Sequence, residues 1–255
     1  MKINKVTFKN TEGDQLTARV ELPDDERPEG YALFAHCFTC NKNLSAVRNI
    51  SRSLTSSGFG VMRFDFTGLG ESEGDFADTN FSSNIQDIGE AVHFLEKEYE
   101  APSLLIGHSL GGAAVLYAAA DVPSVGAVAT IGAPADPNHV TRLISSGLEK
   151  IHEKGFAEVS IGGRPFTIKK QFLDDLEAVN MPTVLTKMGK ALLIAHSPQD
   201  QIVGIDNAAD IFKAARHPKS FISLDGADHL LSGSRDSAYI GKVIAQWAER
   251  YISSR

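Results

Sequence analysis

The chain has 255 residues, of which 42% are hydrophobic and 22% are charged, an ordinary globular composition with enough length for a sizeable core. Its formal net charge is -7, and no run of Lys and Arg could follow a phosphate backbone, which argues against nucleic acid as a partner. No signal-peptide core and no stretch of about 18 apolar residues is found, so we expect a cytoplasmic soluble protein without a membrane partner.

The N-terminal residues predict an antiparallel hairpin, because two alternating runs, 2–9 and 15–22, are joined by a turn-rich link. Six short apolar runs follow, each typical of a parallel strand buried on both faces: 31–35, 61–66, 103–107, 127–132, 191–196 and 220–224. Helical patterns separate them, near 44–57, 82–99, 110–121, 205–215 and 237–252. This alternation predicts a doubly wound α/β sheet in a single domain, 1–255.

One connection breaks this rhythm. Residues 134–190 are far longer than a normal crossover and contain two amphipathic patterns, around 139–154 and 168–180. We expect a small helical cap, an insertion of the kind that usually covers an active site. Within it, a solvated loop position is favoured for Arg164 over a contact with an anionic substrate group.

The strongest chemical signal is the run Gly-His-Ser-Leu-Gly at 107–111, which follows an apolar run and precedes a helix rich in small residues. A serine between a strand and a helix, with glycine two positions away on each side, is typical of a nucleophile elbow. The glycines relieve the crowding of a strained turn, so the hydroxyl of Ser109 is pushed into a pocket. The pattern predicts that Ser109 is a catalytic nucleophile.

A serine hydroxyl needs a base to accept its proton, and the base needs an acid that fixes its tautomer. In a fold with this elbow the order along the chain is Ser, acid, His. Asp200, after the run 191–196, is our predicted acid, and His229, after the run 220–224, is our predicted base. Asp225 and Asp228 are the alternative acids. The other histidines, His36, His93, His108, His139, His152, His196 and His217, are interpreted as structural or surface residues.

The oxyanion formed during attack needs two backbone amides, one after the nucleophile and one from the loop after an early strand. Leu110 is the predicted first donor, and Phe38, after the run 31–35, is the predicted second, with Cys37 as the alternative. Cys37 and Cys40 have the spacing of a redox motif whose oxidation could gate this loop. The favoured interpretation of the two cysteines is nevertheless a pair of ordinary buried thiols.

At several segments the chain resembles the α/β-hydrolase superfamily, and more closely a bacterial branch often fused to an OsmC-like peroxidase domain. These segments are AHCFTC (35–40), RFDFTGLGESEG (63–74), GHSLGG (107–112), IGAPADP (131–137), IGGRPF (161–166) and DGADH (225–229). The resemblance covers nearly the whole chain and implies an eight-stranded sheet and a triad of Ser109, Asp200 and His229. One departure is Cys37, which follows His36 where many relatives have glycine.

The expected activity is hydrolysis of a carboxylic ester or related acyl bond through an acyl-enzyme, with no metal or organic cofactor required. An alternative is a perhydrolase or acyl transferase that uses the same triad, and another is a non-catalytic ligand-binding or partner module. The expected partner is a small acyl substrate, with a second copy of the chain and an OsmC-like peroxidase as further options.

Overall fold

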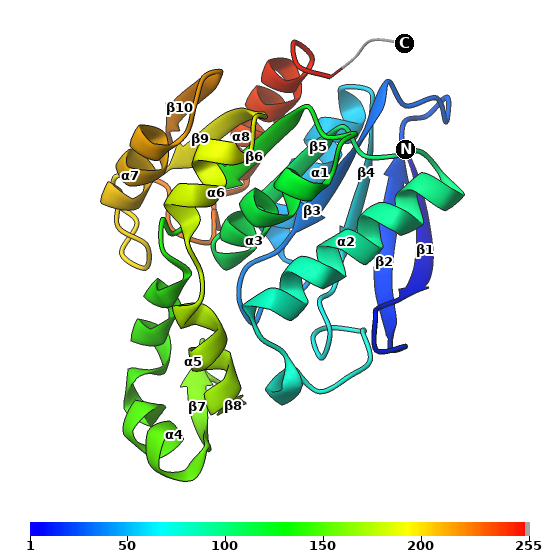
Figure 1. Cartoon of the computed structure of the whole chain (residues 1–255). Coiled ribbons are helices and arrows are strands. Elements are labelled where there is room, and N and C mark those ends of the chain that lie inside the picture. The colour runs from blue at the N-terminus through cyan, green and yellow to red at the C-terminus, as the bar shows by residue number, and fades with distance from the viewer. Residues whose placement is uncertain (253–255) are drawn as a thin grey trace.

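The computed structural model describes residues 1–252, and residues 253–255 of the expected domain lie outside the described part. An eight-stranded sheet runs through the centre, in the order β1-β2-β4-β3-β5-β6-β9-β10 (Figure 1). β1 and β2 form an antiparallel hairpin, β2 is also antiparallel to β4, and the other neighbours are parallel. The bounds are β1 (Lys2–Lys9), β2 (Gln15–Leu22), β3 (Gly30–Ala35), β4 (Phe59–Phe64), β5 (Leu104–His108), β6 (Ala127–Ile131), β9 (Ala191–His196) and β10 (Lys219–Ser223).

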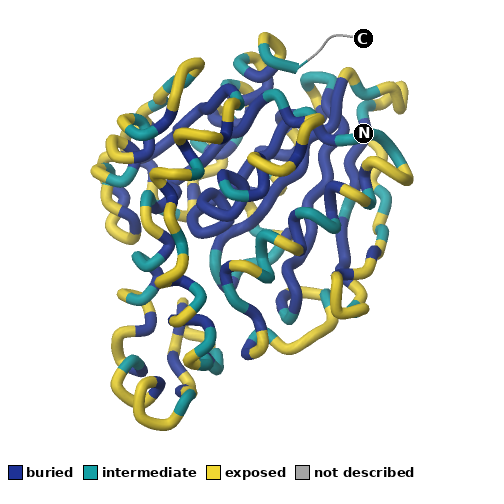
Figure 2. The backbone as a smooth tube through the Cα atoms, viewed as in Figure 1, coloured by how far each residue is buried: buried dark blue, intermediate teal, exposed yellow. Residues whose placement is uncertain are grey.

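Helices cover both faces of the sheet, and each face has its own hydrophobic core. α1 (Ser45–Ser56) and α8 (Ser234–Ala248) share one core, while α2 (Phe81–Glu98), α3 (Leu110–Ala118) and α7 (Asp206–Ala214) contribute to the other. Successive strand residues point to opposite faces, so Leu33 belongs to one core and its neighbour Phe34 to the other. The central strands are therefore buried on both sides, as their continuous apolar runs require (Figure 2).

The predicted doubly wound α/β sheet is confirmed. Each predicted strand is present, with ends that differ from the expected ones by at most two residues. The predicted helices outside the insertion are also present, and the last begins at Ser234, three residues earlier than expected. Among residues 1–252, no helix combines the length and the apolar character that crossing a membrane requires.

The insertion, residues 134–190, projects from the C-terminal ends of the parallel strands (Figure 1). The expected helices are present in it, but the expectation of a helical cap missed a two-stranded sheet that lies between them. Its elements are the 3-10 helix η3 (Pro137–Gly147), α4 (Leu148–Lys154), β7 (Phe156–Ile161), β8 (Arg164–Lys169), α5 (Lys170–Glu177) and α6 (Met181–Lys187).

The hairpin of β7 and β8 has a local cause. Buried and exposed residues alternate along β7, which is the period of a strand with one covered face. Gly162 and Gly163 then adopt positive φ angles of 57° and 77°, the backbone that tight hairpin turns need. The covered face packs on η3, where a Cβ on Gly147 would meet the Val159 side chain at 2.4 Å. The sequence analysis missed this strand because its alternation covers only six residues and lies between two longer helical patterns.

Candidate active site

Ser109 lies on a sharp turn between β5 and α3. Its φ of 56° and ψ of -127° belong to a backbone region that residues other than glycine rarely adopt. A Cβ on Gly107 would lie 2.3 Å from the Gly111 carbonyl oxygen, and a Cβ on Gly111 would lie 2.3 Å from that of His36. Only glycine fits these two positions, so the turn packs tightly against the end of β3.

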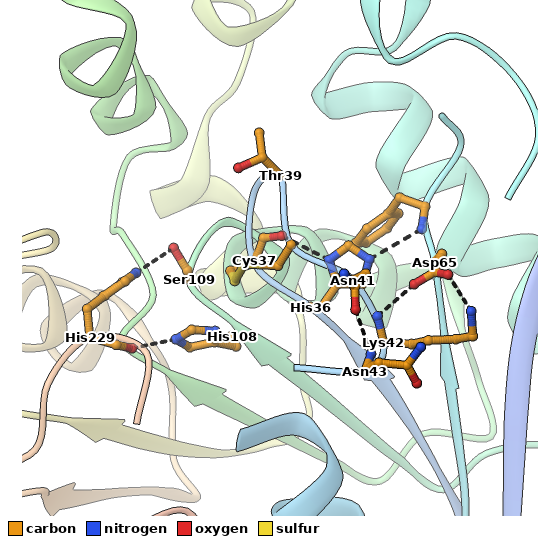
Figure 3. Close-up of a disulfide and its surroundings, with 12 residues drawn as sticks. His36, Cys37, Thr39, Asn41, Lys42, Asn43, Asp65, His108, Ser109 and His229 are labelled. Atoms are coloured by element: carbon orange, nitrogen blue, oxygen red, sulfur yellow. Dashed lines mark hydrogen bonds and ion pairs between the residues drawn. A yellow bond between two sulfur atoms is a disulfide. The ribbon is translucent and has the colours of Figure 1, made fainter. Parts of the chain in front are cut away.

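The structure brings Ser109, His229 and Asp200 into one hydrogen-bonded chain. His229 Nε2 is 3.0 Å from Ser109 Oγ, and His229 Nδ1 is 2.7 Å from Asp200 Oδ2 (Figure 3 shows the serine and the histidine). Because an ionised carboxylate can only accept, the ring proton of neutral His229 lies on Nδ1, and Nε2 is left to accept from the serine hydroxyl. The three residues follow β5, β9 and β10, whose carboxyl ends meet at one edge of the sheet.

Asp200 is held by its own loop. Its Oδ1 accepts hydrogen bonds from the amides of Ile202 and Val203, both at 2.9 Å. Burial alone would raise the pKa of Asp200, but the hydrogen bonds from His229 and from the two amides hold that pKa below its ordinary value. The carboxylate therefore stays ionised beside the histidine.

The alternative acids are engaged elsewhere. Asp225 accepts a hydrogen bond from Ser223 Oγ at 2.7 Å, and Asp228 accepts one from the Ser232 amide at 2.7 Å. The first bond joins the end of β10 to the loop that follows it, and the second lies within that loop. Asp200 is the carboxylate that contacts His229, although it is 29 residues away in sequence.

Three buried histidines lie near the hydrogen-bonded series of Ser109, His229 and Asp200. The sequence interpretation assigned none of them to the site. His108 Nε2 is 2.7 Å from the main-chain oxygen of His229, and His196 Nε2 is 2.7 Å from that of Val203. His36 Nδ1 is 2.9 Å from the main-chain oxygen of Cys37. Burial is the main cause that lowers the pKa of each of these histidines below its ordinary value. The pKa of His108 is lowered to about 3. The available signal was that His36 and His108 lie inside segments that carry the family resemblance, and that His196 is the last residue of the run 191–196.

We expect acid to weaken the fold through these histidines. An unfolded chain binds a proton on His108 near pH 6.5, whereas the folded protein binds it near pH 3. Between these values the unfolded state holds the extra proton, so the free energy of unfolding falls as the pH falls, by about 1.4 kcal/mol per pH unit for each such proton. His36 and His196 act in the same direction. The buried Asp87 carboxyl, whose pKa burial raises to about 6, acts in the opposite direction below that pH.

Urea unfolding at pH 6, 5 and 4 measures this dependence. The variant His108→Gln removes one titrating group and should make the slope shallower by about one proton. The exposed His93 is the matched position, and His93→Gln should leave the slope unchanged. Equal slopes in the wild type and His108→Gln would contradict the assignment of a buried, neutral His108.

The loop after β3 lies against the elbow and is closed by a disulfide. Cys37 and Cys40 are bonded, with their Cα atoms 5.3 Å apart, and the Cys40 amide donates to the Cys37 carbonyl at 3.1 Å (Figure 3). The interpretation of the two cysteines as free thiols was wrong, because a tight turn brings side chains three residues apart together. The positive φ falls on Thr39, at 61°, so Cys37 does not need the backbone freedom of glycine.

The two predicted oxyanion donors belong to the loop after β3 and to the start of α3. Phe38 lies between the bonded cysteines, and Leu110 is the first residue of α3. The close approach of the His36 carbonyl to Gly111 brings the loop and the N-terminus of the helix together. An amide at a helix N-terminus has no partner within the helix, which suits it to binding negative charge.

The insertion contacts the same loop. The Arg164 guanidinium donates a hydrogen bond to the Thr39 carbonyl and lies 5.2 Å from the centre of the Phe166 ring. Arg164 is exposed, as the sequence interpretation expected, but its guanidinium also makes these two contacts, which that interpretation did not include. Phe38 stacks on Phe172 of α5 with ring centres 5.4 Å apart, so two separate contacts tie the insertion to the loop.

The loop ends on a buried ion pair. Lys42 and Asp65 have fully buried side chains, and the Lys42 ammonium pairs with the carboxylates of Asp65 and Glu71. The Lys42 amide also donates to Asp65 Oδ1 at 2.6 Å. Arg63 donates to the Lys42 carbonyl and pairs with Glu21. Asp65 follows β4, so the ion pair joins the end of that strand to the loop beside Ser109.

Breaking this pair should destabilise the protein. We expect Lys42→Met to lower the free energy of unfolding by about 3 kcal/mol, because Asp65 would remain as a buried charge without its cation. Lys5 also pairs with Glu71 but is about half exposed, so Lys5→Met should cost at most about 1 kcal/mol. Urea unfolding of the two variants measures the difference, and equal losses would show that the burial of Lys42 adds nothing.

Within residues 1–252 no three His, Cys, Asp or Glu side chains gather as metal ligands would. The arrangement instead joins a hydroxyl, an imidazole and a carboxylate beside a loop and a helix N-terminus. A doubly wound sheet that presents a serine on such an elbow, with the histidine and the aspartate on later strand ends, defines an α/β-hydrolase. More particularly, the chain belongs to the family described as serine aminopeptidase, S33, whose sequence model matches residues 28–165.

Known proteins with related sequences or structures include several hydrolases. The esterase domain of a Rhodothermus marinus protein is 54% identical, covers 99% of this chain and 100% of its own, and has a TM-score of 0.82. Est1E from Butyrivibrio proteoclasticus, solved with ferulic acid, is 18% identical over 97% of this chain and 99% of its own, with a TM-score of 0.78, and shows likeness of fold alone.

Among curated proteins, the mitochondrial palmitoyl-protein thioesterase ABHD10 of Rattus norvegicus is 31% identical over 118 residues. The match covers 46% of this chain and 38% of the relative. The monoglyceride lipase of the same organism is 38% identical over 25% of this chain and 22% of its own length. The chain therefore matches well under half the length of these curated relatives.

Proposed function

We propose that the chain is a serine hydrolase of the carboxylesterase type, which cleaves an ester through an acyl-enzyme. The observation that carries the proposal is the hydrogen-bonded chain from Ser109 Oγ through His229 to Asp200, on a nucleophile elbow. The 54% identity with an esterase domain over nearly the whole chain supports it.

In the proposed first half-reaction, Ser109 Oγ bonds to the ester carbonyl carbon while its proton passes to His229 Nε2. Asp200 stabilises the imidazolium that forms. The Leu110 and Phe38 amides hold the negative charge that develops on the carbonyl oxygen. The tetrahedral intermediate then collapses, the bond to the alcohol oxygen breaks, and the alcohol leaves with the proton from His229.

In the second half-reaction water takes the place of the alcohol. His229 accepts a proton from the water molecule while the water oxygen bonds to the acyl carbon. The carboxylic acid leaves, and the proton returns from His229 to Ser109 Oγ. The scheme uses only side chains and amides of this chain.

A thioester is a second candidate substrate, favoured by the 31% match to a palmitoyl-protein thioesterase. A thiol of pKa near 8.5 leaves as a thiolate with less help from a general acid than an alcohol needs. The same three residues would therefore also serve this reaction. Pairs of esters and thioesters with the same acyl chain compare the two directly.

The test combines a substrate panel with labelling of the nucleophile. p-Nitrophenyl esters with acyl chains from two to sixteen carbons, and matching thioesters, should give turnover, with a burst of nitrophenol of one per chain if deacylation is the slower step. A fluorophosphonate should add to Ser109, as mapped by peptide mass. A protein that shows neither turnover nor a labelled Ser109 would overturn the proposal and favour a ligand-binding module.

A further inference from the structure

His108, the residue between Gly107 and Ser109, has a fully buried side chain that meets the loop of the predicted base. Its Nε2 is 2.7 Å from the main-chain oxygen of His229, and the two rings are 5.1 Å apart (Figure 3). We propose that His108 is a positioning residue, which holds the main chain of His229 and thereby sets the distance of its ring from Ser109. The inference rests on the proposed function and deepens it.

The direction of this hydrogen bond follows from its partner. A carbonyl oxygen only accepts, so His108 Nε2 carries the proton and donates. His108 Nδ1 is buried and has no hydrogen-bond partner among residues 1–252, so a second proton would find no acceptor there. The ring therefore stays neutral, and the charged or titratable groups that face it are His229, Asp200 and His36.

This hydrogen bond connects two parts of the site whose positions are otherwise fixed by different segments of the fold. The elbow fixes the place of Ser109, while His229 lies on the loop after β10. Other bonds hold that loop to its neighbours, such as the one from Ser197 Oγ to the Ala227 carbonyl at 2.6 Å. The bond from His108 runs from the residue next to the serine to the residue that bears the base.

The chemistry depends on that link. Proton transfer from Ser109 needs the hydroxyl and the imidazole within hydrogen-bond reach, and they are 3.0 Å apart. A misplacement of about 1 Å can cost about 10²-fold in rate. A neutral His108 also leaves the imidazolium formed on His229 free of a second positive charge at close range.

The experiment replaces His108 by side chains of graded reach. Gln places its amide nitrogen three bonds from Cβ, as histidine places Nε2, so His108→Gln keeps the donor. Asn places the nitrogen one bond short, and Leu has no donor. His93→Gln, at an exposed position, is the matched control for the change of residue type. Turnover of a p-nitrophenyl ester and the rate of fluorophosphonate labelling are measured for each protein under conditions well below its unfolding midpoint. Urea unfolding gives the stability of each variant.

The expected order is that His108→Gln retains kcat within about threefold, while His108→Asn and His108→Leu lose about tenfold or more. KM should change by less than about twofold, and the labelling rate should fall with kcat, because the base and not the substrate contact is displaced. Equal kcat in the Leu and Gln variants, or losses that follow stability and not reach, would overturn the inference. A wild type with neither turnover nor labelling would instead overturn the proposed function.

Discussion

Ser109→Ala should lower kcat for ester hydrolysis by about 10⁴-fold or more, because it removes the atom that forms the acyl-enzyme. Alanine leaves the base, the acid and the amides in place, so only the slow attack of water on a bound ester remains. The small side chain fits the elbow, although its positive φ stays costly. The free energy of unfolding should therefore change little.

The measurement is the initial rate with a short-chain p-nitrophenyl ester, together with fluorophosphonate labelling and a urea unfolding curve. Ser145→Ala, at an exposed position in the insertion, serves as the matched serine replacement and should keep wild-type activity. A rate for Ser109→Ala within tenfold of the wild type would remove this serine from the mechanism.

Asp200→Asn should lower kcat by about 10⁴-fold while leaving the site almost unchanged in shape. The Ile202 and Val203 amides both donate to Oδ1, so an asparagine keeps its oxygen there and turns its NH₂ group towards His229. An NH₂ group donates, so His229 Nδ1 must accept and its proton moves to Nε2. The imidazole then presents a proton to Ser109 instead of a lone pair.

Activity over a range of pH and the labelling rate with fluorophosphonate measure this effect. Asp225→Asn is the matched control, since Asp225 is the alternative acid and accepts from Ser223, and its kcat should stay within about twofold. A comparable loss in both variants, or a small loss in Asp200→Asn, would contradict the role of Asp200 as the acid that orients the base.

The sheet was predictable because strands that are buried on both faces appear in the sequence as nearly continuous apolar runs. The run 191–196 is buried at every position and its first five residues are apolar, because successive side chains point to opposite faces and both faces are covered by helices. The elbow was predictable because two glycines are required on steric grounds, as the close contacts at Gly107 and Gly111 show. Asp200 and His229 followed from their places after strands, and the structure brings both to Ser109.

The remaining parts depend on contacts that sequence spacing does not encode. The Cys37–Cys40 bond could not be predicted without the turn geometry at Thr39. The buried Lys42–Asp65 pair joins residues that are 23 positions apart in the sequence. His108 and His196 were interpreted as structural because a lone histidine shows no partner in sequence. Only the fold reveals that their acceptors are main-chain oxygens in the loops that bear the acid and the base.

The contacts between the insertion and the loop after β3 have a consequence for protein engineering. The insertion leaves and rejoins the sheet between two neighbouring strands, β6 and β9, and has its own covered hairpin, so it could be exchanged as a block in a chimaera. Phe38 would then lose its stacking partner Phe172, and Thr39 would lose the hydrogen bond from Arg164. A foreign insertion would therefore need residue 38 and its partner transplanted together, so that the insertion and the loop after β3, which carries one of the predicted oxyanion donors, are exchanged in the same step.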